Sequence, residues 1–407
     1  MLIKEVKARE ILDSRGFPTI EVELNTNNGE FRASVPSGTS IGKNEALELR
    51  DKNNRYCGLG VQKAVENINQ KIAPKIKYLS PSNQTEIDKL LLKLDGTKDK
   101  SKLGANAILA VSIAVCKAGA GENNLPVYKH MAKLAKNKLI KIPQIMMLVI
   151  EGGKHADKSS DIQEFMINPI ENNFKEALRK STEVYHIIKE ILKGKGFITS
   201  VGYEGAFPSP YSENEKVFDL ILEGIKNSGY INEFHLAIDA AASEFFSNGR
   251  YFLDGKQLTY EDLLNIYYKW NENYPLSSIE DPFDEEDELA WKMISESIQD
   301  EIMIVGDDFL VTNTERIRKA IKQKLCNALL VKPNQIGTIS ETLYAVSLAQ
   351  SAGWKIIVSH RSGETTDDFI ANFAVGVGAD YVKFGAPCRG ERTAKYNELL
   401  RISEKIK

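Results

Sequence analysis

Residues 236–239 read LAID, and the same kind of run, short, apolar and closed by one charged residue, returns in the segments that follow. The later runs are SSIE (277–280), IVGD (304–307), LLVK (329–332), IIVSH (356–360) and YVK (381–383). Runs of this kind are typical of buried strands, and the intervals between them are long enough for a helix. The alternation predicts an α/β fold, a βα barrel, for the second half of the chain.

The residues that close these runs are the first candidates for a functional site. In a βα barrel the carboxyl ends of the strands meet at one mouth, where active sites lie. The mouth would therefore gather Asp239, Glu280, Asp307, Lys332, His360 and Lys383. Acids at several strand ends can hold a hard divalent cation, and lysines beside them can bind or deprotonate an anionic substrate. The pattern predicts a metal-dependent enzyme.

The first part of the chain predicts a smaller unit of another class. Residues 19–26 and 30–35 alternate apolar with polar side chains around Asn-Asn-Gly, which indicates an antiparallel hairpin. Helical patterns follow at 60–72, 83–94 and 104–120, and the last is apolar enough to be buried. Strands followed by helices predict an α+β domain.

A short basic stretch and the strand-like run QIMMLVI (144–150) mark the domain boundary. We expect the α+β N-terminal domain to span residues 1–134 and the catalytic barrel to span 135–407. Within the barrel, Ser212 to Glu215 matches a capping box and predicts an amphipathic helix that continues to about Lys226.

Composition excludes several classes of partner. The chain has 53 Lys and Arg against 56 Asp and Glu, so its net charge of -3 predicts no broad attraction to nucleic acid or to an anionic membrane. The four cysteines are scattered without a CxxC pair, and no signal peptide or membrane span is indicated. A cytoplasmic protein is expected, with no nucleic acid and no membrane partner.

Ordered segments over nearly the whole chain resemble the enolase family. They are AREILDSRGFPT (8–19), VPSGTSIGKNEALELRD (35–51), LDGTKDKSKLGANAILAVS (94–112), GGKHA (152–156), DIQEFMI (161–167), AIDAAASEF (237–245), SIEDPF (278–283), VGDD (305–308), KPNQIGT (332–338), VSHRSGET (358–365) and GAPCRGERTAKYNELLRI (385–402). The resemblance implies a small α+β N-terminal domain followed by an enolase-type βα barrel whose first units depart from the regular alternation. It also implies that QEFMI (163–167) and VGYEG (201–205) are strands of that barrel.

The activity that the resemblance implies is the magnesium-dependent, reversible dehydration of 2-phospho-D-glycerate to phosphoenolpyruvate, a lyase reaction of glycolysis and gluconeogenesis. Removal of the C2 proton beside an ionised carboxylate makes a dianion, so the barrier is mainly one of charge, and two magnesium ions offset it. The resemblance further implies a homodimer or higher homo-oligomer. Its ion pairs would involve Arg9, Glu21, Arg401 and Glu404.

Metal ligands are implied residue by residue. Three acids, Asp239, Glu280 and Asp307, would hold the first Mg²⁺. The second would arrive with the substrate and bind Ser40, in a loop over 36–43 that is expected to be mobile and to close over the ligand.

The same resemblance implies the catalytic and substrate-binding residues. Lys332 would take the C2 proton, with a pKa lowered by magnesium and by Lys383. Glu204, with Glu164 beside it, would protonate the departing C3 hydroxyl. The phosphate would bind Arg361 and Ser362, the carboxylate would bind Lys383, and His155 and His360 would close the site.

Several residues depart from the usual family pattern near these positions. They are Phe17 for Asn, Ile41 for Thr, Glu151 for Asn, Tyr203 for Asp, Ala206 for Gly and Phe384 for Thr. Tyr203 is expected to matter most, because it adjoins Glu204 and could change the hydrogen bonding or the pKa of the proton donor.

Three functions remain open at this point. A divergent enolase is the simplest, because every implied ligand and catalytic residue is present. An enolase paralogue that acts on a related phosphorylated hydroxy acid is the second, and a catalytically silent binding or scaffold protein on the enolase fold is the third. The joint presence of Ser40 and Arg361 favours a phosphorylated substrate, and a scaffold would have no need of Lys332.

Overall fold

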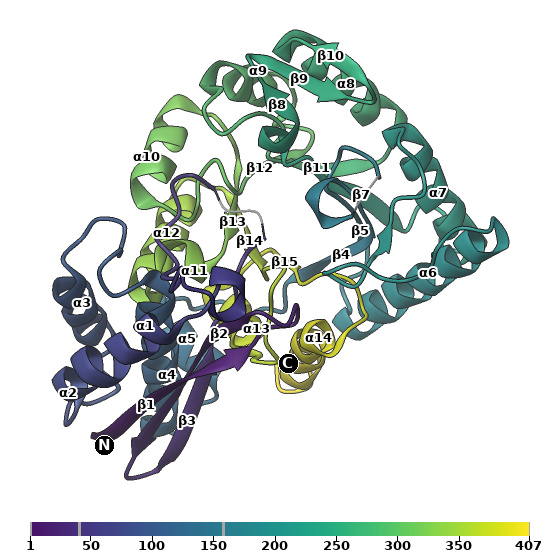
Figure 1. Ribbon diagram of the computed structural model, residues 1–407. Helices are drawn as coiled ribbons and strands as arrows, with labels where there is room; N and C mark the ends of the chain where they lie inside the picture. The colour runs from purple at the N-terminus through teal and green to yellow at the C-terminus, as the bar shows by residue number, and fades with distance from the viewer. Residues whose placement is uncertain (1, 40–41, 157–158, 407) are drawn as a thin grey trace.

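An antiparallel three-stranded sheet opens the chain in the computed structural model, which describes residues 2–39, 42–156 and 159–406 (Figure 1). Its strands, in the order β1-β2-β3, are β1 (Ile3–Leu12), β2 (Pro18–Thr26) and β3 (Gly29–Ser34). The expected hairpin is therefore present as β2 and β3. Ile20, Val22 and Leu24 alternate along β2 and are fully buried, which fixes the face of the sheet that meets the helices.

The core helix of this unit is α4 (Ala105–Glu122). It packs on β2 and β3, and nearly all of its residues are buried, which explains why it is apolar on every side. By length and composition α4 could cross a membrane, but 83% of its 18-residue window is buried inside the protein, as in the core helix of a soluble fold. The surrounding helices are η1 (Arg55–Gly58), α1 (Gln62–Glu66), the π-helical η2 (Asn67–Ile72), α2 (Ala73–Ile76), α3 (Gln84–Asp95) and α5 (Val127–Leu134).

A closed barrel of eight strands forms the larger unit (Figure 1). The strands are β4 (Gln144–Glu151), β5 (Glu164–Pro169), β7 (Phe234–Asp239), β11 (Leu276–Glu280), β12 (Met303–Gly306), β13 (Ala328–Val331), β14 (Lys355–Ser359) and β15 (Tyr381–Lys383). Parallel pairing of β15 with β4 closes the barrel. Every apolar run predicted as a strand from 236 to 383 is a barrel strand.

The first strands of the barrel are not all parallel. Strand β5 runs antiparallel to both of its neighbours, β4 and β7. The start of β5 therefore lies at the same mouth as the ends of the parallel strands, and Glu164 pairs in register with Asp239. This confirms the irregular opening expected from the family resemblance.

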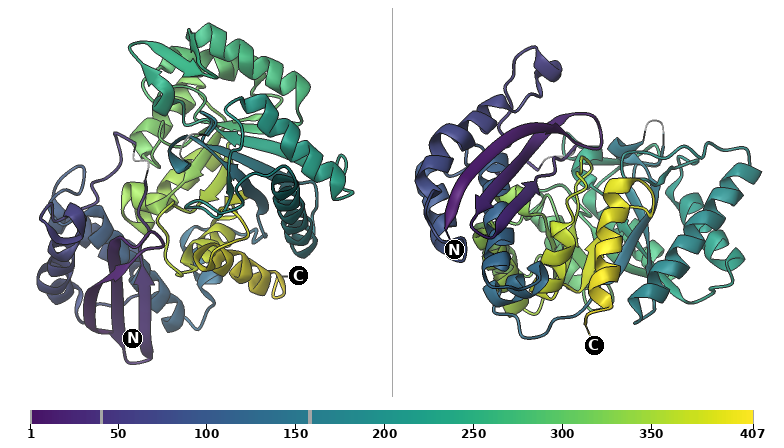
Figure 2. Two further views of the ribbon diagram at one scale, coloured as in Figure 1. Left: turned by 45° about the vertical axis from the view of Figure 1, so that its right-hand side comes forward. Right: turned by 90° about the horizontal axis from the view of Figure 1, so that it is seen from below.

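Helices surround the barrel and a small sheet lies at its rim (Figures 1 and 2). The long helices are α6 (Phe174–Gly194), α7 (Asn214–Asn227), α8 (Tyr260–Asn273), α9 (Glu288–Ile298), α10 (Thr314–Gln323), α12 (Ile339–Ser351), α13 (Phe369–Val377) and α14 (Gly390–Ser403). Shorter elements are η3 (Gly153–His155), β6 (Phe207–Pro208), η4 (Ala242–Phe245), β8 (Phe246–Ser247), β9 (Arg250–Leu253), β10 (Lys256–Leu258) and α11 (Pro333–Ile336).

The N-terminal unit lies against α12 and α13 of the larger unit (Figure 2). A buried carboxylate, Asp88, joins the N-terminal unit to α12. Asp88 on α3 accepts hydrogen bonds from the backbone N–H of Ser340 at 2.9 Å and from the hydroxyl of Ser112 at 2.7 Å. Burying a carboxylate requires such partners, so the contact is specific rather than incidental.

Two local predictions were wrong. Residues 201–205 form a turn rather than a strand, because the Gly202 N–H donates back to the Ala206 carbonyl at 2.9 Å and Gly205 has a φ of +86°. The strand at this place is β6, which pairs with the end of β4.

The expected capping box is the second correction. Helix α7 is present and continues to Asn227, but its N-cap is Glu213 without a side-chain cap. The Ser212 hydroxyl instead donates to the Glu213 carboxylate at 3.1 Å. A nearby acid therefore competes successfully with the helix N–H groups for this hydroxyl.

Candidate active site

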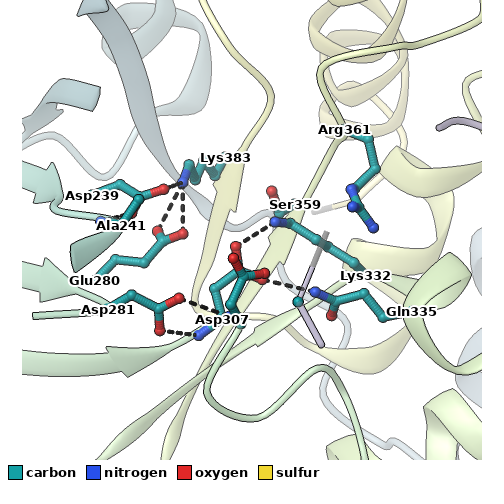
Figure 3. A network of polar contacts seen from close by, with 12 residues as sticks. Asp239, Ala241, Glu280, Asp281, Asp307, Lys332, Gln335, Ser359, Arg361 and Lys383 are labelled. Carbon is teal, nitrogen blue, oxygen red and sulfur yellow. Dashed lines mark hydrogen bonds and ion pairs between the residues drawn. The ribbon is translucent and has the colours of Figure 1, made fainter. Parts of the chain in front are cut away.

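The charged residues that close the barrel strands gather at one mouth (Figure 3). Asp239, Glu280 and Lys383 end β7, β11 and β15, and their side chains are almost fully buried. Asp307, Lys332 and His360 follow β12, β13 and β14 directly. Parallel register aligns these ends, as in the pairing of Glu280 with Asp239. The barrel thus explains why residues distant in sequence share one cavity.

Three carboxylates form the centre of the cavity. Oxygens of Asp239, Glu280 and Asp307 all lie within 4.8 Å of one another. The ammonium of Lys383 lies 3.0 Å from Asp239 Oδ2 and 2.8 Å from Glu280 Oε1 (Figure 3). It also lies 3.0 Å from Glu164 Oε2. Burial raises the pKa of Glu280 well above its ordinary value, as does the charge of Asp239, while Lys383 opposes them.

This donor set fits a hard divalent cation. Carboxylate oxygens are the ligands that Mg²⁺ prefers, and buried acids require compensating positive charge. Lys383 supplies one positive charge to Asp239, Glu280 and Glu164 together, so the cluster remains rich in negative charge. Ser40, the predicted ligand of a second ion, lies outside the described residues, as does Ile41.

The backbone beside the cluster is locally strained. Asp281, which follows Glu280, has a φ of +41° and its carboxylate accepts the N–H groups of Asp307 at 2.9 Å and of Asp308 at 2.7 Å. Non-glycine residues in this region cost free energy and are held by surrounding contacts. Asp281 thereby fixes the loop that carries Asp307.

Lys332 faces the carboxylate cluster from β13. Its ammonium bonds Asp307 Oδ2, and Gln335 donates to the other oxygen of Asp307 at 2.9 Å (Figure 3). Burial lowers the pKa of Lys332, but the charges of Asp307 and Asp308 outweigh it and raise the pKa above its ordinary value, against Arg361 and Lys383. The lower pKa expected beside bound magnesium stays a prediction, and Lys383 acts in the expected direction.

Two glutamates lie on the opposite side of the mouth. The Nδ1 atom of His155 is 3.8 Å from both Glu164 Oε1 and Glu204 Oε1. Burial raises the pKa of Glu164 well above its ordinary value, assisted by the charges of Glu204 and Asp239. Burial also raises the pKa of Glu204, but His360, His155 and Arg392 more than offset it and hold that pKa well below its ordinary value. The two glutamates therefore differ in proton affinity, and Glu164 holds a proton more readily than Glu204.

His360 connects Glu204 to a buried arginine on α14. Its Nε2 lies 3.0 Å from Glu204 Oε2, and its Nδ1 lies 2.6 Å from Arg392 Nη1. Because a guanidinium can only donate, Nδ1 accepts and the ring proton lies on Nε2, facing Glu204. Burial lowers the pKa of His360 to about 4, so the ring is neutral at neutral pH.

Arg361 and Ser362 lie where the N-terminal unit meets the mouth. Arg361 is buried and makes a bidentate pair with Glu45 at 3.0 and 3.1 Å. The Ser362 hydroxyl lies 2.7 Å from that of Thr39, which also accepts from Arg15 Nη1 at 2.7 Å. The N-terminal unit therefore supplies side chains to this corner of the barrel.

Sequence reasoning missed several of these contacts. Arg392, Gln335, Glu45, Arg15 and Thr39 were assigned no role. Arg392 has no distinguishing signal, because an arginine on a polar helix is usually exposed, whereas here it is fully buried. Gln335 lies one helical turn after Lys332, and the Pro333 start of α11 could have indicated that it returns to the same site.

The residues that depart from the family pattern differ in how deeply they are buried. The Tyr203 side chain is 45% exposed, whereas Glu151 is 0% exposed. The guanidinium carbon of Arg15 lies over the Phe17 ring, 5.6 Å from its centre. The buried Phe384 ring packs edge-on against the ring of Tyr396. Ala206 is also buried, in the turn after Glu204.

Comparisons with known proteins agree over almost the whole length. The family model described as "Enolase, N-terminal domain" matches residues 3–131, and "Enolase, C-terminal TIM barrel domain" matches residues 139–407. A curated protein named Enolase, from Elusimicrobium minutum (strain Pei191), is 48% identical over 410 residues, which covers 99% of this chain and 96% of that protein.

Proposed function

Because the chain belongs to the enolase family of lyases, we propose that it catalyses the magnesium-dependent, reversible dehydration of 2-phospho-D-glycerate to phosphoenolpyruvate. The observation that carries the proposal is the arrangement of the mouth. A carboxylate cluster lies between a lysine on one side, Lys332, and a pair of glutamates on the other, Glu164 and Glu204. An elimination needs such an arrangement, because one group removes a proton while another protonates the leaving hydroxyl.

The three central acids, Asp239, Glu280 and Asp307, would hold one Mg²⁺, and Ser40 would contribute to a second that arrives with the substrate. A bound cation would supply stabilisation of the negative charge that develops at the substrate carboxylate. The buried, charge-rich donor set supports this assignment.

Lys332 is proposed to remove the proton from C2. For this its amine must be neutral, so its ion pair with Asp307 must be released before the reaction. Arg361 and Lys383, which oppose the raised pKa of Lys332, would then favour the neutral amine. The proton moves from C2 to Nζ, and its electron pair remains with the substrate.

Glu204 and Glu164 are proposed to deliver the second proton. The C3–O bond breaks as the oxygen takes a proton from this pair, and the hydroxyl leaves as water. The pKa of Glu164 is raised and that of Glu204 is lowered, and His155 adjoins both. His360 donates to Glu204 and thereby fixes the orientation of its carboxylate.

Arg361 and Ser362 are proposed to bind the phosphate, and Lys383 the carboxylate. The guanidinium of Arg361 now donates to both carboxylate oxygens of Glu45. A phosphate at Arg361 would have to replace this carboxylate. His155 and His360 close the site. We propose that the reaction belongs to glycolysis and gluconeogenesis and that the protein is cytoplasmic.

Assembly as a homodimer or higher homo-oligomer, and the division into domains at 134/135, belong to the same proposal. Within one chain Arg9 already pairs with Glu21 at 2.7 Å, and Arg401 pairs with Glu398 at 2.6 Å. These arginines would therefore exchange or share partners at a dimer contact. Sedimentation of the purified protein tests the assembly.

The deciding experiment follows phosphoenolpyruvate by ultraviolet absorbance after 2-phosphoglycerate is added to purified protein with Mg²⁺. Turnover that chelation abolishes and that Glu280→Gln removes supports the proposal, with the surface variant Glu190→Gln as the control. Folded, magnesium-loaded protein without turnover would refute it. Activity on another phosphorylated hydroxy acid would then identify a paralogue, and none at all would identify a binding or scaffold protein.

A further inference from the structure

Glu151 is a buried acid that the proposed reaction does not use. It ends β4, is 0% exposed, and neither of its carboxyl oxygens meets a hydrogen-bond partner among the described residues. Buried polar groups are nearly always paired, so an unpaired carboxyl at this position requires an explanation. The ionised form would be costly there, because the site is buried and Glu204 carries the same charge nearby.

The Glu151 side chain packs directly under the turn that carries Glu204. A Cβ atom added to Gly202 would lie 1.8 Å from Glu151 Oε1, so the carboxyl fills the space beside that α-carbon. Only glycine leaves room for it. The turn is also tied down by its own N–H bond from Gly202 to Ala206, and by Arg389, whose Nε donates to the Gly202 carbonyl at 2.8 Å.

The backbone of Glu151 joins the same elements. It pairs with Glu164 in the β4–β5 ladder, and its carbonyl accepts from the Ser209 N–H at 2.8 Å, just after the turn. Residue 151 therefore lies at the junction between the strand of one catalytic glutamate and the turn of the other. Its side chain is one contact between the turn and the barrel wall.

The charged and titratable groups that face Glu151 come from every element packed around it: Glu164 on β5, Tyr185 on α6, Glu204 on the turn and Arg392 on α14. Burial raises the pKa of Glu151 to about 8, and the charge of Glu204 adds to this. The N–H groups of Glu204 and Gly202 and the charge of Arg392 oppose the shift without cancelling it. At neutral pH the carboxyl is protonated.

We propose that Glu151 is a positioning residue whose uncharged carboxyl supports the 202–206 turn and sets the charge balance around Glu204. Loss of its proton to solvent would place a second negative charge beside Glu204. That charge would increase the proton affinity of Glu204 and favour displacement of the turn from the barrel wall. The inference rests on the proposed function, because it assigns Glu151 an effect on the proton delivery of that reaction.

The first test does not depend on activity. Infrared spectroscopy of the metal-free protein should show the carbonyl band of a protonated carboxylic acid at neutral pH that is missing in Glu151→Gln. The band should disappear as the pH is raised through about 8. Its absence from the wild-type protein would overturn the proposal whether or not the protein is an enolase.

The second test is the pH profile of kcat/KM. The wild-type profile should show an ionisation near pH 8 that Glu151→Gln removes, so that the alkaline limb moves upward by about one pH unit or more. Glu151→Asn provides a second neutral variant if glutamine folds poorly. Glu190→Gln is the matched control, since it removes the charge of a glutamate whose side chain is exposed.

Superimposable profiles of the wild-type protein and both neutral variants would overturn the proposal. A loss of activity at all pH values with an unshifted limb would also overturn it, because that is the effect of a purely structural side chain. Absence of any wild-type dehydration would refute the proposed function instead, and the infrared band would still decide the protonation of Glu151.

Discussion

Arg392 Nη1 lies 2.6 Å from His360 Nδ1, at the far side of the imidazole ring from Glu204. This contact determines the tautomer of His360, because the guanidinium leaves only the acceptor form of Nδ1 possible. Arg392 also donates to the Arg361 carbonyl at 2.5 Å and to the Tyr203 carbonyl at 3.1 Å. One buried side chain on α14 therefore joins two segments of the mouth, the one after β14 and the turn that carries Glu204.

Replacement of Arg392 by lysine should lower kcat/KM by about 10- to 100-fold, because lysine cannot reproduce the planar set of donors and His360 loses its fixed tautomer. Arg401→Lys, on the exposed face of the same helix, is the control and should retain activity. The measurement is steady-state kinetics with 2-phosphoglycerate. Equal rates for the two variants would contradict the role of Arg392.

Lys332→Ala should reduce turnover by about 10²- to 10⁴-fold, the range that a general base contributes. Substrate-dependent binding of Mg²⁺ should remain largely intact, because the carboxylate cluster is preserved. Isothermal titration with substrate present measures the second quantity. Lys322→Ala, an exposed lysine near the end of α10, is the control. Unchanged turnover of Lys332→Ala would show that Lys332 is not the general base.

Lys383→Met should destabilise the metal-free protein by about 3–5 kcal/mol, because Asp239, Glu280 and Glu164 lose their shared buried counter-charge. Mg²⁺ should restore much of this loss, since a cation that binds the folded state stabilises it. Thermal unfolding with Mg²⁺ and with chelator measures both effects. The control is Lys355→Met on the exposed start of β14. A loss that Mg²⁺ leaves unchanged would contradict the shared role of these groups.

Glu151→Gln should stabilise the protein increasingly as the pH rises. The pKa of Glu151 is about 8 in the folded protein against an ordinary value of 4.5, so between these values the folded state binds a proton that the unfolded chain has lost. Stability therefore falls as the pH rises through this window, and the penalty at pH 8 is on the order of 4 kcal/mol.

Urea unfolding measured at about pH 5 and about pH 8 tests this sign. The difference in unfolding free energy between Glu151→Gln and the wild-type protein should be small at the lower value and largest at the upper one. An equal difference in unfolding free energy at the two pH values would show that Glu151 does not titrate in this range. Glu190→Gln, exposed on α6, provides the baseline.

Gly202→Ala should cost about 1–3 kcal/mol, because the new methyl group overlaps Glu151 Oε1 and forces the side chain or the turn to move. The cost should be much smaller in a Glu151→Ala background, where the space is open. A double-mutant cycle on unfolding free energies measures the coupling. Additive effects of the two substitutions would mean that the residues do not constrain each other.

The barrel was predictable from its strands and much of the mouth from their ends. Runs such as IIVSH and LLVK are apolar and β-branched, and a parallel barrel leaves little choice about where their last residues lie. The turn at 201–205 was not predictable in this way, because its conformation depends on Gly202 fitting against Glu151, a contact between distant segments.

The pKa shifts of the buried groups could not be predicted from the sequence either. Asp307 lies against Lys332 and raises its pKa despite burial, and the ionisation of Glu151 depends on burial that no local pattern reveals. Tyr203 adjoins Glu204 in sequence, but its side chain is largely exposed. Glu151, 53 positions before Glu204, is buried against the turn that carries it.

The pairing of β15 with β4 has a consequence for the order in which the protein assembles. Lys383 lies on the last strand to leave the ribosome, while its partners on β5, β7 and β11 are synthesised long before it. Until the final strand docks, those acids lack their cation and favour contact with water over burial. Completion of the ring and arrival of the Lys383 charge at its centre are therefore a single late event, and a nascent chain that stops short of residue 383 should keep its catalytic mouth open and hydrated.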